Sequence, residues 1–171
     1  MASDPRLGDN IEHRSEQNDS PLLDEEMQLI SWLDPGTAAC LRRVTANVAR
    51  QAPHALAVIL FGSVARHEER PLSDRHPSDV DVLALFTPVE DQDAITSEQH
   101  AALSWAVVYA YEAFPDAMRD VQVLGALTHF QHWDESFVEN VARDGILLWA
   151  RGPLPAALRP VEERRSQIAV G

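Results

Sequence analysis

The sequence contains no lysine, one cysteine and few aromatic residues, which make up 6% of its 171 positions. The absence of lysine excludes catalysis by a lysine amine, so any basic side chain that contacts a phosphate must be an arginine. A single cysteine, Cys40, excludes an internal disulfide and a cysteine-rich zinc site, and is typical of a reducing compartment. We expect Cys40 to be a small buried residue on a helix.

Long hydrophobic runs and an excess of positive charge are also missing. No apolar stretch approaches the roughly 20 residues that cross a bilayer, and the polar N-terminus contains no signal-peptide core. We therefore expect a cytoplasmic protein with no membrane partner. The formal net charge of −13 argues against an extended nucleic-acid surface, because phosphate backbones bind basic faces.

The residues that are present suit one globular domain. A hydrophobic fraction of 45% is enough for a core in a chain of this length without disulfide bonds. We expect a disordered lead-in over residues 1–20, a folded domain over residues 21–150 and a loose C-terminal tail over residues 151–171.

Helical and strand patterns alternate along the domain. Helices are expected over residues 21–33, 37–52, 96–114 and 133–145, and strands over residues 55–61, 79–86, 120–127 and 146–150. Thr37 and Ser97 are the expected caps of the second and third helices. The third helix has a predicted buried stripe, formed by Leu103, Ala106, Val107 and Ala110. Trp105 and Tyr109 share one face of the same helix, and we expect them to pack in the core too. The alternation predicts an α/β (α+β) layer structure with helices packed on a small β-sheet.

Two carboxylates lie in an apolar strand that follows a Gly-Ser turn. The stretch "LFGSVARHEERPLSDRHPSDVDVLALF" contains Gly62-Ser63 and the pair Asp79 and Asp81. Strand alternation places both carboxylates on one face, where they repel unless a hard cation lies between them. Mg²⁺ accepts one or two carboxylates together with substrate phosphates, and a glycine turn that opens a helix favours phosphate. The combination predicts a nucleotide site.

The same stretch resembles the signature of the DNA polymerase β-type nucleotidyltransferase superfamily, in its minimal nucleotidyltransferase branch. The likeness covers roughly residues 37–150, and its specific motifs lie within residues 60–86. The resemblance implies a mixed β-sheet with packed helices. It also implies that two Mg²⁺ ions assist the transfer of a nucleoside monophosphate from ATP or another NTP to a hydroxyl.

The resemblance also implies roles for individual residues. Those that would bind the nucleotide are Gly62, Ser63 and Arg66. Those that would hold the metal and act in catalysis are Asp79, Asp81 and, as the third carboxylate on a later strand, Asp120. Gln122 lies on the same strand face as Asp120, and if it takes the third position instead, the site lacks one charge.

Two departures from the family pattern stand out. His67 occupies the position of an expected glycine, and fifteen residues separate Ser63 from Asp79, more than in compact members. We expect the extra loop, residues 68–77, to be a surface insertion, with a substrate loop or a partner contact as alternatives. His129 and His132 form an H-x-x-H pair without further ligand residues, so we expect ordinary surface or packing histidines.

The resemblance implies a partner as well. Minimal nucleotidyltransferases are often encoded beside a helical HEPN protein, which they neutralise as an antitoxin by adding AMP to it. One alternative is an aminoglycoside-modifying nucleotidyltransferase, because an acidic surface suits a polycationic substrate. A second alternative is a binding protein of the same fold without turnover, which His67 and the choice between Asp120 and Gln122 favour.

Overall fold

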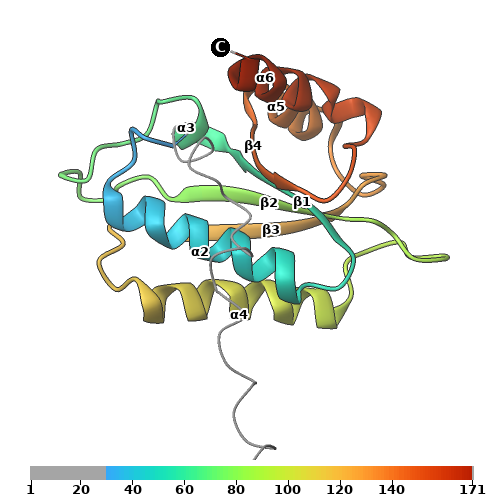
Figure 1. Cartoon of the computed structure of the whole chain (residues 1–171), viewed down its shortest axis with the longest axis horizontal. Coiled ribbons are helices and arrows are strands. Elements are labelled where there is room, and N and C mark those ends of the chain that lie inside the picture. The colour runs from blue at the N-terminus through green and yellow to red at the C-terminus, as the bar shows by residue number, and fades with distance from the viewer. Residues whose placement is uncertain (1–29, 171) are drawn as a thin grey trace, which may run out of the picture.

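The computed structural model of the chain describes residues 30–170, with side chains through Gln167. The lead-in and most of the helix expected over residues 21–33 therefore lie outside the described residues. The helices, labelled as in Figure 1, are α2 (Pro35–Gln51), α3 (Gly62–Ala65), α4 (Ser97–Ala113), α5 (Glu135–Asp144), the 3-10 helix η1 (Ala156–Leu158) and α6 (Arg159–Val170). The strands are β1 (Ala55–Phe61), β2 (Val80–Phe86), β3 (Val121–Leu127) and β4 (Ile146–Ala150).

The four strands form one mixed sheet in the order β3-β2-β1-β4. β1 runs antiparallel to both of its neighbours, whereas β2 and β3 are parallel. A parallel pair needs a crossover connection, and α4 supplies it between β2 and β3. The expected fold class, a small mixed β-sheet with packed helices, is confirmed.

Helices cover both faces of the sheet (Figure 1). On one face, α2 and α4 enclose a core that includes Leu41 and Val82. On the other face, α5, η1 and α6 enclose a second core that includes Ile59 and Leu158. β1 is buried on both faces, which explains its nearly continuous apolar sequence. Cys40 lies in the first core as expected, where burial raises the pKa of its thiol to about 11.

Two helix caps differ from the expected ones. Asp34, not Thr37, caps α2: the Asp34 carboxylate accepts hydrogen bonds from the Thr37 N–H and hydroxyl, at 2.9 and 2.7 Å. The helix then begins at Pro35, whose fixed φ and missing N–H suit the first helical position. Thr96, one residue before Ser97, caps α4 through a capping box with Gln99.

The C-terminal segment is not loose, so that expectation is wrong. η1 and α6 bury Leu154, Leu158 and Val161 in the second core. The Arg164 guanidinium donates to the carbonyls of Ala142 and Gly145, at 2.8 and 2.7 Å, at the C-terminal end of α5. Carbonyls at the end of a helix have no N–H partner within the helix, and here Arg164 donates the missing hydrogen bonds. The segment is rich in Pro, Arg and Glu, a composition typical of an unstructured tail, and so the sequence did not predict this packing.

The expectation that Trp105 and Tyr109 pack in the core is also wrong. Both are exposed on the outer face of α4, where their rings stack at a centroid distance of 5.3 Å. The buried face of the helix is formed by Gln99, Leu103, Ala106 and Ala110, of which the last three were predicted as part of its buried stripe. Although α4 is rich in apolar residues, no helix within residues 30–170 has the length and apolar character to cross a membrane.

Candidate functional site

The Gly-Ser turn lies directly against Asp81. β1 ends at Phe61, which pairs with Asp81 of β2, and the next residue, Gly62, has a φ of 79°. A Cβ atom at Gly62 would lie only 2.7 Å from Asp81 Oδ2. Glycine is therefore needed both for the left-handed backbone and for the close approach of the turn to the carboxylate. The Gly-Ser turn and the Asp-x-Asp pair, which are separated in the sequence, are therefore adjacent in the structure.

Asp79 and Asp81 form a half-buried pair of like charges. Burial raises the pKa of the Asp81 carboxyl, and the nearby negative charge of Asp79 raises it further. Asp81 shares its face of the sheet with Leu83, which belongs to the second core. A divalent cation between the carboxylates would offset both the desolvation and the repulsion.

The adjacent strand β3 places Gln122, not Asp120, in contact with this pair. Gln122 is the register partner of Asp81, and its Nε2 donates a hydrogen bond of 2.8 Å to Asp79 Oδ2. Asp120 is exposed just before β3, and its backbone carbonyl accepts a bond of 2.8 Å from the Val80 N–H. The sequence left the choice between Asp120 and Gln122 open.

The donor set fits one Mg²⁺ ion better than two. Two carboxylates and one amide, with substrate phosphates, are suitable oxygen ligands for one such ion. Within residues 30–170, no three His, Cys, Asp or Glu side chains are grouped closely enough to hold a metal. A second ion of the kind that the resemblance implies would thus lack a third clustered carboxylate.

Arg66 points toward two acidic residues, Glu68 shortly after α3 and Asp144 at the end of α5. Its Nε lies 3.0 Å from Glu68 Oε2, and its Nη1 lies 4.0 Å from Asp144 Oδ2. Asp144 is also bound by Arg143 at 2.8 Å, a hydrogen bond that lowers the pKa of the Asp144 carboxyl. Arg66 would have to exchange these partners in order to contact a phosphate.

Arg119 was not identified from the sequence. Its side chain is only 7% exposed, and its Nη1 donates to the carbonyls of Arg70 and Ser78, both at 2.9 Å. The Ser78 hydroxyl in turn accepts a 2.7 Å hydrogen bond from the Arg70 N–H. Arg119 therefore closes the inserted loop immediately before Asp79. No local pattern identifies it, because its partners are distant in sequence.

Replacing Arg119 with methionine is expected to lower the free energy of unfolding by about 2–4 kcal/mol, because two carbonyls lose a charged donor. Arg75→Met, on the exposed part of the same loop, is the matched control and should change it by less than about 0.5 kcal/mol. Urea denaturation of both variants measures the difference. Equal stabilities would contradict the role of Arg119 as the loop closure.

His67 keeps the backbone conformation of the glycine expected at its position. Its φ is 58°, in the left-handed region that glycine adopts without strain. The imidazole stacks on Trp32 with ring centroids 3.9 Å apart. The stacking contact compensates part of the cost of this left-handed backbone.

Two variants separate the backbone strain at His67 from the stacking. His67→Ala keeps the strain and loses the stacking, whereas His67→Gly loses both. We expect His67→Gly to be more stable than His67→Ala by about 1 kcal/mol. Chemical denaturation measures this difference. If both variants unfold at the same denaturant concentration, the left-handed backbone is not strained in the folded protein.

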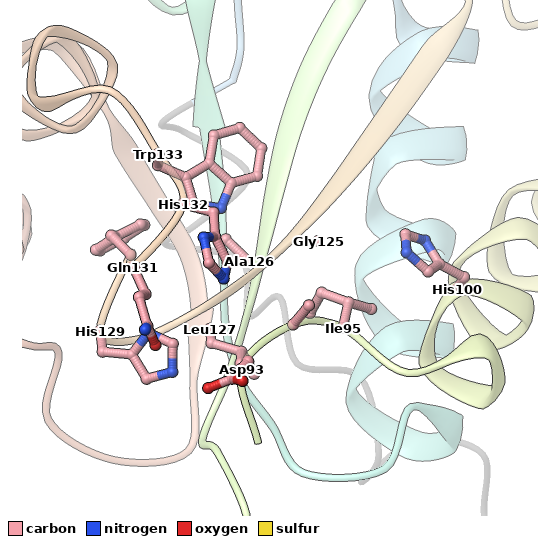
Figure 2. A pocket seen from close by; sticks show the side chains of 12 residues that line it. Asp93, Ile95, His100, Gly125, Ala126, Leu127, His129, Gln131, His132 and Trp133 are labelled. Carbon is pink, nitrogen blue, oxygen red and sulfur yellow. The ribbon is translucent and has the colours of Figure 1, made fainter. Parts of the chain in front are cut away.

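A separate cavity of about 300 Å³ lies beside the C-terminal part of β3 (Figure 2). It is lined by Gly125–Leu127, residues 129–133, residues 93–95 and His100, and it includes neither Ser63 nor Asp79. His129 makes hydrogen bonds with both ring nitrogens, to the Gln92 carbonyl at 3.1 Å and from the Gln131 N–H at 3.2 Å.

Comparisons with known proteins add a likeness in fold. No protein-family model matches the sequence, and no curated protein matches it. The structure is similar to one described as "Crystal structure of the toxin-antitoxin with AMP-PNP", with a TM-score of 0.44 and 16% identity over 75% of this chain and 86% of that chain. It is also similar to a "putative nucleotidyltransferase from Sulfolobus solfataricus", with a TM-score of 0.35 and 20% identity over 74% of this chain and 85% of that chain.

Both similarities are distant, with less than 25% identity and TM-scores below 0.5.

Proposed function

We propose that this protein is a nucleotidyltransferase that transfers AMP from ATP to a hydroxyl on a basic partner protein. The observation that carries the proposal is the approach of the Gly62 turn to Asp81, with Asp79 on the same strand face. Asp79 and Asp81 would hold Mg²⁺, which when bound neutralises phosphate charge and activates the α-phosphorus. This combination of turn and carboxylates supports nucleotide chemistry more directly than any other cluster in residues 30–170.

The residues of the chain supply the rest of the site. Gly62 lets the triphosphate approach the backbone, and the Ser63 hydroxyl offers a donor to a phosphate oxygen. Gln122 fixes the carboxylate of Asp79 through its 2.8 Å hydrogen bond. In the proposed step, the acceptor oxygen bonds to the α-phosphorus, the bond to the β-phosphate oxygen breaks, and pyrophosphate leaves. Asp120 receives the proton of the acceptor hydroxyl.

The acidic character of the protein favours a basic acceptor. A net charge of −13 attracts positively charged surfaces and raises the rate of encounter with them. A partner protein neutralised by AMP addition, as in a toxin–antitoxin pair, agrees with the sequence resemblance. A polycationic aminoglycoside satisfies the same electrostatic requirement, so it serves as the competing acceptor in the test.

The test uses ATP labelled at the α-phosphate, with Mg²⁺, and two acceptors: the protein encoded beside this one and a purified aminoglycoside. We expect label on the protein acceptor, and none when Asp79 is replaced with asparagine. Asp116→Asn, at an exposed position after α4, is the matched control and should retain transfer. Label on the aminoglycoside alone would contradict the protein acceptor, and ATP binding without label on either would contradict transfer.

A second candidate function is nucleotide-dependent binding without turnover. The observation that favours it is the amide of Gln122 beside Asp79, where the resemblance implies a third carboxylate. A neutral amide gives less charge to a metal site than a carboxylate does. In that case ATP and Mg²⁺ would stabilise the fold, while the label would remain on ATP.

A further inference from the structure

The outer face of α4 is unusually apolar for a solvent-facing helix. Its inner face is buried in the first core, but the outer face carries Trp105, Val108 and Tyr109, which are 53%, 42% and 47% exposed. Their spacing places these three side chains, with Ala101, in one row, named here the α4 stripe. Scattered single apolar residues would need no explanation, but a continuous row does.

Another surface helix of this protein has the usual pattern. α5 directs Phe137 and Val141 toward the second core and exposes Glu139, Asn140 and Arg143. Its apolar and polar residues therefore lie on separate faces, as expected for a helix with one side in water. The contrast indicates that exposed apolar side chains are a feature of α4 and are not typical of every surface helix in this protein.

The chain segment that carries the α4 stripe is acidic, and it outweighs the three arginines of the neighbouring helix α2, which are Arg42, Arg43 and Arg50. Residues 88–116 contain six carboxylates and no arginine; the carboxylates are Glu90, Asp91, Asp93, Glu98, Glu112 and Asp116. A second copy of the chain would bring the same charges to the contact, and like charges there are unfavourable. The chain's own residues 1–29 carry eight acidic residues and two arginines, so they too have the wrong sign. An occupant with positive charge around an apolar centre fits best.

We propose that the α4 stripe is the docking surface for a helix of another protein, with an apolar face bordered by arginine or lysine. The row from Ala101 to Tyr109 spans about 12 Å along the helix axis, at 1.5 Å per residue, which is enough for two turns of a partner helix. The aromatic rings of Trp105 and Tyr109 provide the large contact area that is typical of binding hot spots.

This surface lies on the opposite side of the sheet from the nucleotide site (Figure 1). α4 packs against the face of β2 that carries Val82, whereas Asp81 points to the other face. A partner on the α4 stripe therefore leaves the Gly-Ser turn accessible. The proposal is independent of nucleotidyl transfer and would stand if the chain proved to be a binding protein only.

The test measures binding of two synthetic helical peptides to the full-length protein by calorimetry. Both have a leucine stripe; one is bordered by arginines and the other by glutamates. We expect the arginine peptide alone to bind, and Val108→Glu to weaken its binding by roughly tenfold to a hundredfold. Leu124→Glu, which adds the same charge at an exposed apolar position on β3, should leave the affinity unchanged.

The choice of glutamate separates docking from simple charge attraction. Each variant makes the protein more acidic, so non-specific attraction of the arginine peptide would be equal or stronger in Val108→Glu. No binding to the wild-type protein, or equal binding to both variants, would overturn the proposal. A dimer in size-exclusion chromatography with light scattering that Val108→Glu dissociates would overturn it in favour of a second copy.

Discussion

Replacing Asp81 with asparagine is expected to reduce AMP transfer by at least about a hundredfold, the effect of removing one preorganised charge-stabilising group. Asp81 is the carboxylate closest to the Gly62 turn, and a neutral amide is a poor substitute for a charged metal ligand. The same change is expected to stabilise the protein in EDTA. The reason is that Asp81 is half-buried beside Asp79, so its negative charge is unfavourable without metal.

The stabilisation should depend on pH in a defined direction. The pKa of Asp81 is raised above the ordinary value of 3.8, first by burial and then by Asp79. Between the unfolded and folded pKa values, the folded state binds more protons than the unfolded state, so stability falls as pH rises. The favourable contribution of Asp81 is fully present below its unfolded pKa and is lost as pH rises through its folded pKa. Asp81→Asn should remove this decline.

Urea denaturation in EDTA at a series of pH values measures the effect. We expect the wild-type and Asp81→Asn proteins to converge in stability at acidic pH and to diverge toward neutral pH, with the variant more stable. Asp91→Asn, at an exposed site in the loop before α4, serves as the control and should follow the wild-type curve. Parallel curves for wild type and Asp81→Asn would show that Asp81 is not destabilised by its surroundings.

Several elements could be predicted from the sequence because each depends on local physics. β1 and β4 coincide with short apolar runs, residues 55–61 and 146–150, that only a covered strand accommodates. The meeting of Gly62 with Asp81 follows from the position of the turn directly after β1 and of Asp81 near the start of β2. The closeness of the turn to this carboxylate was therefore predictable, even though the chain matches no family model.

Other features depend on pairings between distant segments. The contact of Gln122 with Asp79 is set by the parallel register of β2 and β3, which strand alternation alone does not determine. Arg119 finds its carbonyl partners 41 and 49 residues away along the chain. The C-terminal segment packs because Leu154, Leu158 and Val161 are buried in the second core. The composition of the last 21 residues does not predict this contact.

The exposed aromatic residues of α4 illustrate a different limit. Trp105 and Tyr109 satisfy the spacing of a buried stripe, and periodicity alone favoured the core. The smaller residues Ala106 and Ala110 face the sheet instead, because α2 and α4 pack closely there. Periodicity correctly placed Leu103, Ala106 and Ala110 in the buried stripe, but it does not show that a second apolar row on the same helix is left in solvent.

Replacing Gln122 with glutamate is expected to make the protein more dependent on Mg²⁺ and to raise AMP transfer by at least about tenfold. The change is nearly isosteric and puts a carboxylate oxygen in place of Nε2, about 2.8 Å from Asp79 Oδ2. Without metal, the added like charge should lower stability by about 1–2 kcal/mol, because the site is partly screened by solvent. With metal, it supplies the third carboxylate that the cluster lacks.

Leu124→Glu is the matched control for this prediction. It adds the same charge on the same strand and the same face, but Leu124 is the register partner of Leu83, whereas Gln122 is the partner of Asp81. Thermal melts with and without Mg²⁺ should show a larger metal-induced shift for Gln122→Glu than for Leu124→Glu or the wild type. If the two variants shift equally while Asp120→Asn abolishes transfer, Asp120 is the third carboxylate and Gln122 is only its neighbour. If Gln122→Glu gains both metal dependence and transfer, the amide at position 122 is what limits turnover in the natural sequence.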